Sequence, residues 1–177
     1  MVGGLEHLLQ KRILVLTGAL TGGMEPHNVL LAEDSLSHDP IRLIIASPGG
    51  DLDSAFLLYD TIRLLQSPVE TFGRYCASAA ALLLAAGGKR YLSPHAKVML
   101  HKPWGKQEGD SRDWEIQGAE MKKYEGKFIN ALIECGVRKT YVEILGDIDR
   151  DLWLEPEEAI AYGLADEIMT PEVMGRW

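Results

Sequence analysis

The chain has 177 residues, 46% of them hydrophobic, which predicts one domain with a sizeable core. A formal net charge of −8 argues against nucleic acid as a partner, because phosphate binding depends on clustered Lys and Arg. No apolar run reaches the roughly 18 residues of a membrane span, and the N-terminus lacks the pattern of a signal peptide. We therefore expect a soluble, cytoplasmic protein without a membrane partner.

Short runs rich in Ile, Val and Leu alternate with longer amphipathic stretches, a pattern typical of strands buried by crossover helices. The predicted fold class is α/β, in a single domain over residues 1–177, because no repeat or linker divides the chain. Predicted strands cover residues 12–16, 41–46, 69–75, 90–92, 98–101 and 165–169. Predicted helices cover residues 25–34, 54–65, 78–86, 112–135, 139–145 and 156–162.

The predicted helix over residues 112–135 is unusually long, and its apolar side chains recur at mixed three- and four-residue spacings. This pattern fits a helix that reaches beyond its own core, and it also fits an ordinary helix that covers the sheet. The segment 105–110 before it is the most loop-like part of the interior.

A turn of Ser47, Pro48, Gly49, Gly50 and Asp51 follows the predicted strand 41–46. Paired glycines let a backbone turn sharply and bring its N–H groups close to a ligand, which suits an oxyanion site. A plain connection between two elements explains the same turn.

Ser78 lies where the predicted strand 69–75 passes into a helix of small residues. Free backbone N–H groups at a helix N-terminus favour developing negative charge, so Ser78 is a candidate nucleophile and the Ala79 N–H a candidate oxyanion donor. Serine is also a common helix cap. Cys76 is a rival nucleophile, but its place at the strand end favours packing. With Cys135 it fits no zinc or CxxC spacing, and we predict two reduced, buried thiols and no metal or cofactor.

His101 ends the predicted strand 98–101, and its imidazole has an ordinary pKa near 6.5, which suits a base for serine at neutral pH. A purely structural histidine is the alternative. An acid to orient this imidazole would come from elsewhere in the chain, and the acidic cluster over residues 147–151 is a dense source. A solvated acidic loop explains that cluster equally well.

Together these segments resemble the caseinolytic ClpP peptidase family, the proteolytic component of ATP-dependent Clp proteases. The resemblance covers nearly the whole chain, and its matching pieces are residues 47–71, 76–103 and 147–169, in the order of the family. It implies a ClpP/crotonase-like fold of repeated β-β-α units, with a protruding handle helix at about residues 111–135.

The resemblance also implies the site residues. By position, Ser78 matches the family's nucleophile, His101 its base and Asp151 the third member of its triad. The backbone N–H groups of Gly50 and Ala79 match its oxyanion hole. The chain is thus expected to be a serine endopeptidase that cleaves unfolded polypeptides and short peptides by acyl transfer.

The family assembles heptameric rings into a double-ring barrel of fourteen subunits, and the resemblance implies the same homo-oligomer here. Asp149 and Arg150 match a pair that couples contact between rings to the geometry of the triad. An AAA+ ATPase unfoldase is the implied partner. Fewer residues precede Arg12 than in the family, so the segment that engages this ATPase is expected to be short.

One segment departs from the family. Arg74 stands where a glycine usually lies four residues before the nucleophile, Gly73 comes one residue earlier, and the segment is one residue shorter. We expect Arg74 and Tyr75 to reshape the strand beside the substrate.

Three other functions remain alternatives at this point. A catalytically weak or inactive structural subunit of the same family would complete a barrel without cleaving peptides, although such subunits commonly lose triad members. A crotonase-type acyl-CoA enzyme would share the fold and a glycine-based oxyanion hole. A relative of membrane signal-peptide peptidases would pair Ser78 with Lys89 or Lys97.

Overall fold

The computed structural model describes residues 2–22, 25–106 and 108–177, with the backbone alone for residues 2–5 and 25. Residue 107 of the predicted loop 105–110 therefore lies outside the described residues. The elements in chain order are α1 (Val2–Gln10), β1 (Ile13–Thr17), α2 (Glu25–Leu36), β2 (Ile41–Ser47), α3 (Leu52–Leu64), β3 (Val69–Ala77), α4 (Ala79–Ala85), β4 (Lys89–Leu100), α5 (Ser111–Glu134), α6 (Tyr141–Asp147), β5 (Leu152–Leu154), α7 (Pro156–Tyr162), β6 (Glu167–Ile168) and α8 (Pro171–Met174). The predicted α/β class is confirmed.

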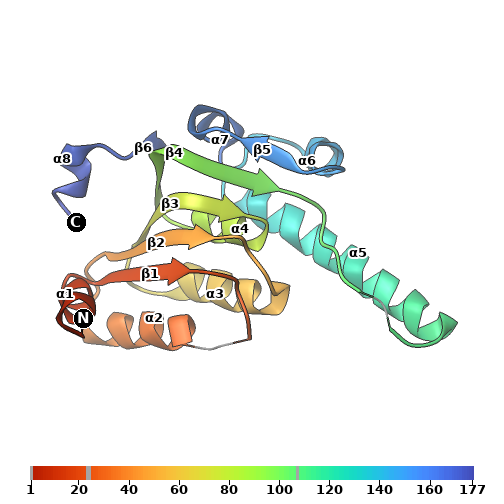
Figure 1. The fold of residues 1–177 in the computed structure, drawn as a ribbon, viewed down its shortest axis with the longest axis horizontal. Coiled ribbons are helices and arrows are strands. Elements are labelled where there is room, and N and C mark those ends of the chain that lie inside the picture. The colour runs from red at the N-terminus through yellow and green to blue at the C-terminus, as the bar shows by residue number, and fades with distance from the viewer. Residues whose placement is uncertain (1, 23–24, 107) are drawn as a thin grey trace.

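The strands form one sheet in the order β1-β2-β3-β4-β5, and β6 pairs with β4. The pairs β1–β2, β2–β3 and β3–β4 are parallel, whereas β5 runs antiparallel to β4. The carboxyl ends of the parallel strands consequently meet at one edge, where open α/β sheets place their ligands. Figure 1 shows these strand ends on the side from which α5 extends.

The main core lies on the face of the sheet covered by α2, α3 and α4. Side chains of β2 alternate between this core and the other face, so Ile45 is fully buried in the main core and Ile44 packs on the opposite side. A smaller cluster fills part of that opposite face, where Phe72 and Tyr91 both contact the ring of Trp177 edge-on.

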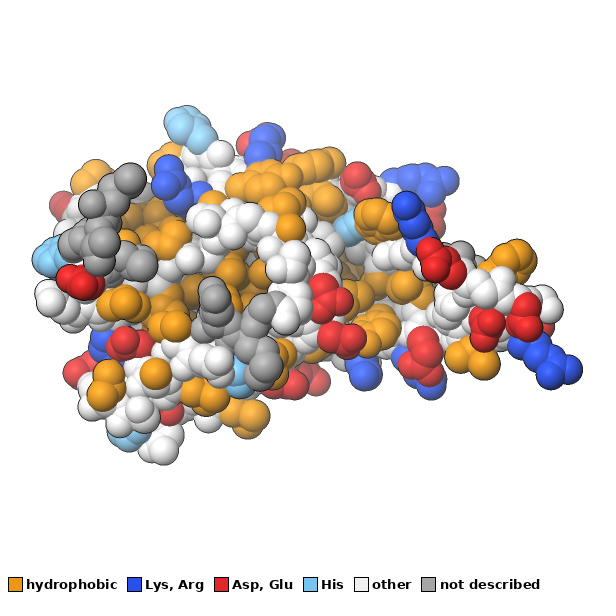
Figure 2. Space-filling model, turned by 60° about the horizontal axis from the view of Figure 1, so that its bottom comes forward, with side chains coloured by type: hydrophobic (Ala, Val, Ile, Leu, Met, Phe, Trp, Pro, Cys, Tyr) orange, Lys and Arg blue, Asp and Glu red, His pale blue; other side chains and the backbone are white. Residues whose placement is uncertain are grey.

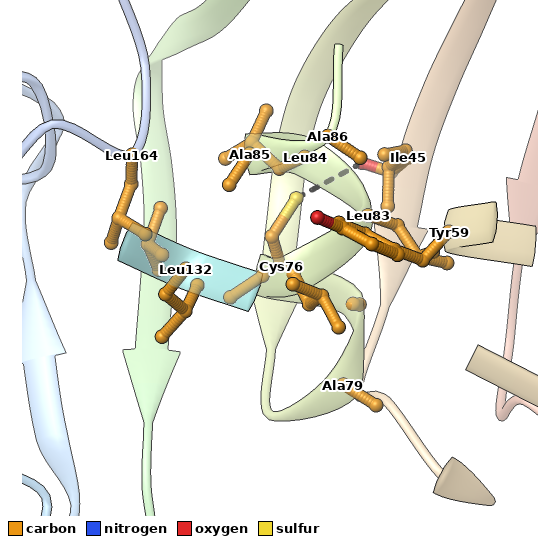
Figure 3. Packing of buried hydrophobic residues seen from close by; sticks show 14 of the residues in the cluster. Ile45, Tyr59, Cys76, Ala79, Leu83, Leu84, Ala85, Ala86, Leu132 and Leu164 are labelled. Atoms are coloured by element: carbon orange, nitrogen blue, oxygen red, sulfur yellow. Dashed lines mark hydrogen bonds between the residues drawn. The ribbon is translucent and has the colours of Figure 1, made fainter. Parts of the chain in front are cut away.

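Helix α4 is buried along its whole length, which its small and apolar sequence AAALLLA permits. Figure 3 shows the core beside it, where the Cys76 side chain is buried and its sulfur lies 3.9 Å from the carbonyl oxygen of Ile45. Burial raises the pKa of the Cys76 thiol far above its usual range. Both cysteines are free, and Cys76 is buried as predicted, but the predicted burial of Cys135 is wrong because this residue is only half-buried.

Helix α5 begins at a capping box, in which Asp110 accepts from the Asp113 N–H and the Asp113 side chain accepts from the Asp110 N–H. Its buried residues, Phe128, Ile129, Ala131 and Leu132, all lie in its C-terminal part. The N-terminal half has no buried residue and leaves Trp114 exposed. The helix thus projects beyond the core, and Figure 2 shows mixed acidic, basic and apolar side chains on the projecting arm.

The prediction of two separate strands in the region of β4 is wrong. Residues 90–92 and 98–101 are not separate strands, because β4 runs unbroken from Lys89 to Leu100 and His101 lies just beyond its end. Between the pairs Gly73–Leu92 and Tyr75–Lys97, β3 advances by two residues and β4 by five, so an irregularity takes up the extra residues. Sequence reasoning also missed α1, which has nine residues, and the shorter elements α8 (four residues) and β5 (three residues).

Arg90, at the start of β4, joins the sheet to two distant turns. Its guanidinium donates to the carbonyl oxygens of Cys135 (2.9 Å) and Gly163 (2.8 Å), and it pairs with the Asp166 carboxylate (2.6 Å). Burial raises the pKa of Asp166, but the hydrogen bonds and charge of Arg90 outweigh burial and leave this pKa below its ordinary 3.8. Deprotonated Asp166 therefore stabilises the fold.

We expect Asp166→Asn to lower the free energy of unfolding by about 1–2 kcal/mol at pH 7, a charged hydrogen bond discounted for partial exposure. Because the pKa of Asp166 is lower in the folded chain, this stabilisation is complete above pH 3.8 and is lost as the pH falls through the folded value. Urea unfolding of both proteins at several pH values measures the difference. A difference that grows towards acid pH would contradict this assignment.

Candidate active site

Ser78 lies at the sharp junction between β3 and α4. Its backbone has φ 57° and ψ −128°, a conformation that residues other than glycine seldom adopt, and its N–H donates to the Met99 carbonyl oxygen at 2.8 Å. The Ser78 side chain makes no capping hydrogen bond with α4. The alternative that this serine serves as a helix cap is therefore wrong, and its hydroxyl is free for another partner.

That partner is His101. Its Nε2 atom lies 2.7 Å from Ser78 Oγ, within hydrogen-bonding distance, although the two residues lie 23 positions apart in the chain. Parallel pairing of β3 with β4 brings them together, because both follow the carboxyl ends of neighbouring strands. With Nδ1 protonated, Nε2 is positioned to accept the serine proton.

Asp151 lies on the far side of the imidazole. Its Oδ1 is 3.9 Å from His101 Nδ1, and its side chain is 60% exposed. This distance allows charge attraction but exceeds a hydrogen bond. The structure thus brings together all three residues of the predicted triad, with a tight contact between Ser78 and His101 and a loose one between His101 and Asp151.

The turn after β2 packs tightly against the Ser78 junction. A Cβ atom added at Gly49, where φ is +86°, would lie 2.6 Å from the Ala77 carbonyl oxygen and 2.9 Å from the Ala79 nitrogen. Gly50 forms a β-bridge with Leu20. In this bridge the Leu20 N–H donates to the Gly49 carbonyl oxygen, and the Asp51 N–H donates to the Leu20 carbonyl oxygen, so the Gly50 N–H takes no part in it. Only glycine fits at these two positions, and their backbone lies beside the serine.

Asp149 and Arg150 lie in the turn that leads to Asp151. Asp149 Oδ1 accepts a hydrogen bond from Lys102 Nζ at 2.7 Å, which lowers the pKa of Asp149 and raises that of Lys102. The Arg150 guanidinium lies 3.4 Å from the Asp149 carbonyl oxygen. An ion pair within the chain therefore joins this acidic turn to Lys102, the residue that follows His101.

A cleft of about 510 Å³ opens over the serine and the histidine. Its apolar lining comes from five elements or turns and consists of Pro48, Leu52, Met99, Pro103, Trp104 and Phe128, beside Gly49, Gly50, Ser78 and His101. Such a cleft can hold an extended chain with an apolar side chain next to the serine. Among the described residues, no group of three or more His, Cys, Asp or Glu could hold a metal ion.

The Clp protease family model matches residues 3–172 of this chain. The chain belongs to the Clp protease family. It is 36% identical to ATP-dependent Clp protease proteolytic subunit 1 of Rhodopirellula baltica, over 92% of this chain and 74% of that protein. It is 38% identical to proteolytic subunit 2 of Chlamydia trachomatis, over 93% of this chain and 84% of the relative.

Membership of the Clp protease family confirms the predicted family and the predicted class of serine-type peptidase. It does not favour the crotonase-type alternative. A serine–lysine pair also lacks support, because Lys89 pairs with Glu167 and Lys97 with Glu155. No helix in the described part of the chain is long and apolar enough to cross a membrane.

The segment that departs from the Clp protease pattern forms a bulge. Ile45 pairs with Gly73 and Ala46 with Tyr75, so Arg74 has no partner on β2. Arg74 and Tyr75 are exposed, with the Tyr75 ring beside that of Trp153, and neither lines the cleft. The bulge shifts the register of β3, and an effect of Arg74 and Tyr75 on bound substrate stays a prediction.

Sequence reasoning missed three residues at this site: Trp104 and Phe128, which line the cleft, and Lys102, which pairs with Asp149. Trp104 is 75% exposed at the rim of the cleft, and a large aromatic residue in a predicted loop was the available signal. Phe128 comes to the cleft from the C-terminal part of α5, and nothing in its local sequence marks it. Lys102 was also missed, because its pairing with Asp149 depends on how a distant turn folds back.

Proposed function

We propose that this chain is a serine endopeptidase in which Ser78 is the nucleophile, His101 the general base and Asp151 the residue that orients the imidazole. The 2.7 Å contact between Ser78 Oγ and His101 Nε2, at the floor of an open cleft in a Clp protease family chain, carries this proposal. The intact triad argues against an inactive structural subunit.

In the proposed reaction, His101 Nε2 accepts the hydroxyl proton as Ser78 Oγ attacks a peptide carbonyl carbon. The imidazolium then donates this proton to the leaving amine, and a peptide acyl ester remains on Ser78. Water attacks this ester with His101 again as base, which releases the second product and restores the serine. Asp151 favours the tautomer with Nδ1 protonated, and we expect its 3.9 Å contact to shorten when substrate is bound.

The N–H groups of Gly50 and Ala79 are the proposed donors to the oxyanion. Two observations support them: the close approach of the glycine turn to the Ala79 nitrogen, and the place of Ala79 at the start of α4. A single oxyanion donor typically contributes about 2.7–4 kcal/mol to the transition state.

We further propose that the chain assembles into two heptameric rings that enclose the active sites, with α5 as the handle between rings. The exposed N-terminal half of α5, with its mixture of charged and apolar side chains, supports a role in contact between subunits. Asp149 and Arg150 are the proposed link between ring contact and the triad. Cytoplasmic location stays a prediction.

Unfolded polypeptides and short peptides are the proposed substrates, because a buried chamber would exclude folded proteins. The relatives are named as subunits of ATP-dependent proteases, and an AAA+ ATPase unfoldase is accordingly the proposed partner for long chains.

Covalent labelling of the purified wild type tests this function. We expect a fluorophosphonate probe to label Ser78 alone, as located by peptide mass spectrometry, and a fluorogenic peptide to be cleaved. Light scattering should give the mass of a ring assembly. An assembled protein that neither labels nor cleaves would refute the peptidase, and a labelled monomer would refute the proposed assembly.

A further inference from the structure

Lys102 directly follows His101 and makes two contacts with the turn that carries Asp151. Its Nζ atom lies 2.7 Å from Asp149 Oδ1, and its backbone N–H donates to the Ile148 carbonyl oxygen at 3.3 Å. One residue thus joins the segment that holds the base to the turn that holds the acid.

The Asp151 carboxylate needs such support. It lies 3.9 Å from His101 Nδ1, is largely exposed, and follows a turn with little buried side-chain surface after Ile148. Asp149 is only two residues before Asp151, so an anchor on Asp149 restricts where Asp151 can move. The contact of Arg150 with the Asp149 carbonyl stays within the turn and ties it to nothing else.

We propose that Lys102 is a positioning residue, whose ion pair with Asp149 keeps Asp151 beside His101. This inference rests on the proposed roles of Ser78, His101 and Asp151. Lys102 touches none of the reacting atoms, and its side chain is 37% exposed against 63% for Asp149. An exposed pair of this kind contributes little to folding, so its loss should affect catalysis more than stability.

The other charged groups near Lys102 are Glu125 on α5, which attracts it, and Arg150, which repels it. Asp149 has the strongest effect on Lys102, through a direct hydrogen bond. Glu125→Gln should therefore leave catalysis near the wild-type level, whereas Asp149→Asn should resemble the loss of Lys102.

The test compares Lys102→Met, which keeps an unbranched side chain without the charge, with Lys102→Arg, which keeps the charge. We expect Lys102→Met to lower kcat about 10- to 100-fold with KM within twofold, because a displacement of about 1 Å in a catalytic group can have effects of this size. Lys102→Arg should recover most of the activity. The exchanged pair Lys102→Asp with Asp149→Lys should be more active than either single variant.

Lys89→Met is the matched control, because Lys89 makes an ion pair with Glu167 (3.2 Å) at the start of β4, far along the chain from the end of β4 that Lys102 follows. The same charge is removed there, and kcat should not change. Light scattering and circular dichroism on the Lys102 and Lys89 variants should give wild-type assembly and fold.

Wild-type kcat in Lys102→Met would overturn the proposal, as would a Lys102→Arg variant as slow as Lys102→Met. A loss of kcat that accompanies loss of the ring assembly would overturn it too, since Lys102 would then act on subunit contact. A wild type that fails to label at Ser78 would overturn the proposed function itself, together with this inference. If the wild type is labelled at Ser78 but the Lys102 variants do not behave as expected, only the inference about Lys102 fails and the proposed function stands.

Discussion

Ser78→Ala should lower kcat/KM for a fluorogenic peptide by about 10⁴- to 10⁶-fold, the usual cost of losing a triad nucleophile. The substitution removes the one oxygen that contacts His101 Nε2 in the cleft and leaves no other group there to form the acyl ester. Stability should hardly change, because the Ser78 side chain makes no cap hydrogen bond and alanine retains the Cβ atom.

Cys76→Ala serves as the control for the nucleophile. It alters the thiol two residues before Ser78, which is buried and whose pKa is raised by burial. We expect this variant to lose some stability and to keep both hydrolysis and fluorophosphonate labelling. Activity that survives Ser78→Ala but disappears in Cys76→Ala would assign the nucleophile to the thiol instead.

Gly50→Ala should damage the fold and the chemistry together. Its Cβ atom would lie 2.2 Å from the Leu20 carbonyl oxygen and 2.8 Å from the Leu20 nitrogen, and the backbone has φ +149°. The contacts are with backbone atoms, which cannot rotate away as a side chain can. We expect the free energy of unfolding to fall by about 2–5 kcal/mol, and hydrolysis to fall by at least about 100-fold as the oxyanion donor is displaced.

Gly88→Ala is the matched control, because an added Cβ atom there meets only the Val69 carbonyl oxygen, at an ordinary 3.7 Å. Urea unfolding should give nearly the wild-type free energy for Gly88→Ala, and hydrolysis should be unchanged. If Gly50→Ala were as stable and as active as Gly88→Ala, the tight turn would not be the oxyanion site.

Much of the candidate site follows from the sequence for a topological reason. Ser78 and His101 each follow an apolar run that reads as a buried strand, and parallel neighbouring strands bring their carboxyl ends to one edge. Local pattern alone explained Ser78 more readily as a helix cap than as a nucleophile. The resemblance of three segments to one family, in order, selected the nucleophile, the base and Asp151 together.

The strands were less predictable at their irregular points. Pro94 and the polar residues around it break the apolar pattern of β4, so the sequence suggested two strands where the chain stays extended as one. The bulge at Arg74 shifts the register of β3 against both neighbours. Hydrogen bonds to neighbouring strands keep the chain extended across such breaks in the apolar pattern. The order of residues along the chain does not show which strands pair or in which register.

The sequence by itself determined the α/β class, the family and the identity of the residues at the strand ends, because hydrophobic period and short motifs are local properties of the chain. Tertiary structure alone decided which half of the expected protruding helix α5 leaves the core, that Asp151 lies 3.9 Å from the imidazole, and that Lys102 pairs with Asp149. These are distances between segments far apart in the chain. Packing, register and the path of the turns fix such distances, and no local pattern encodes them.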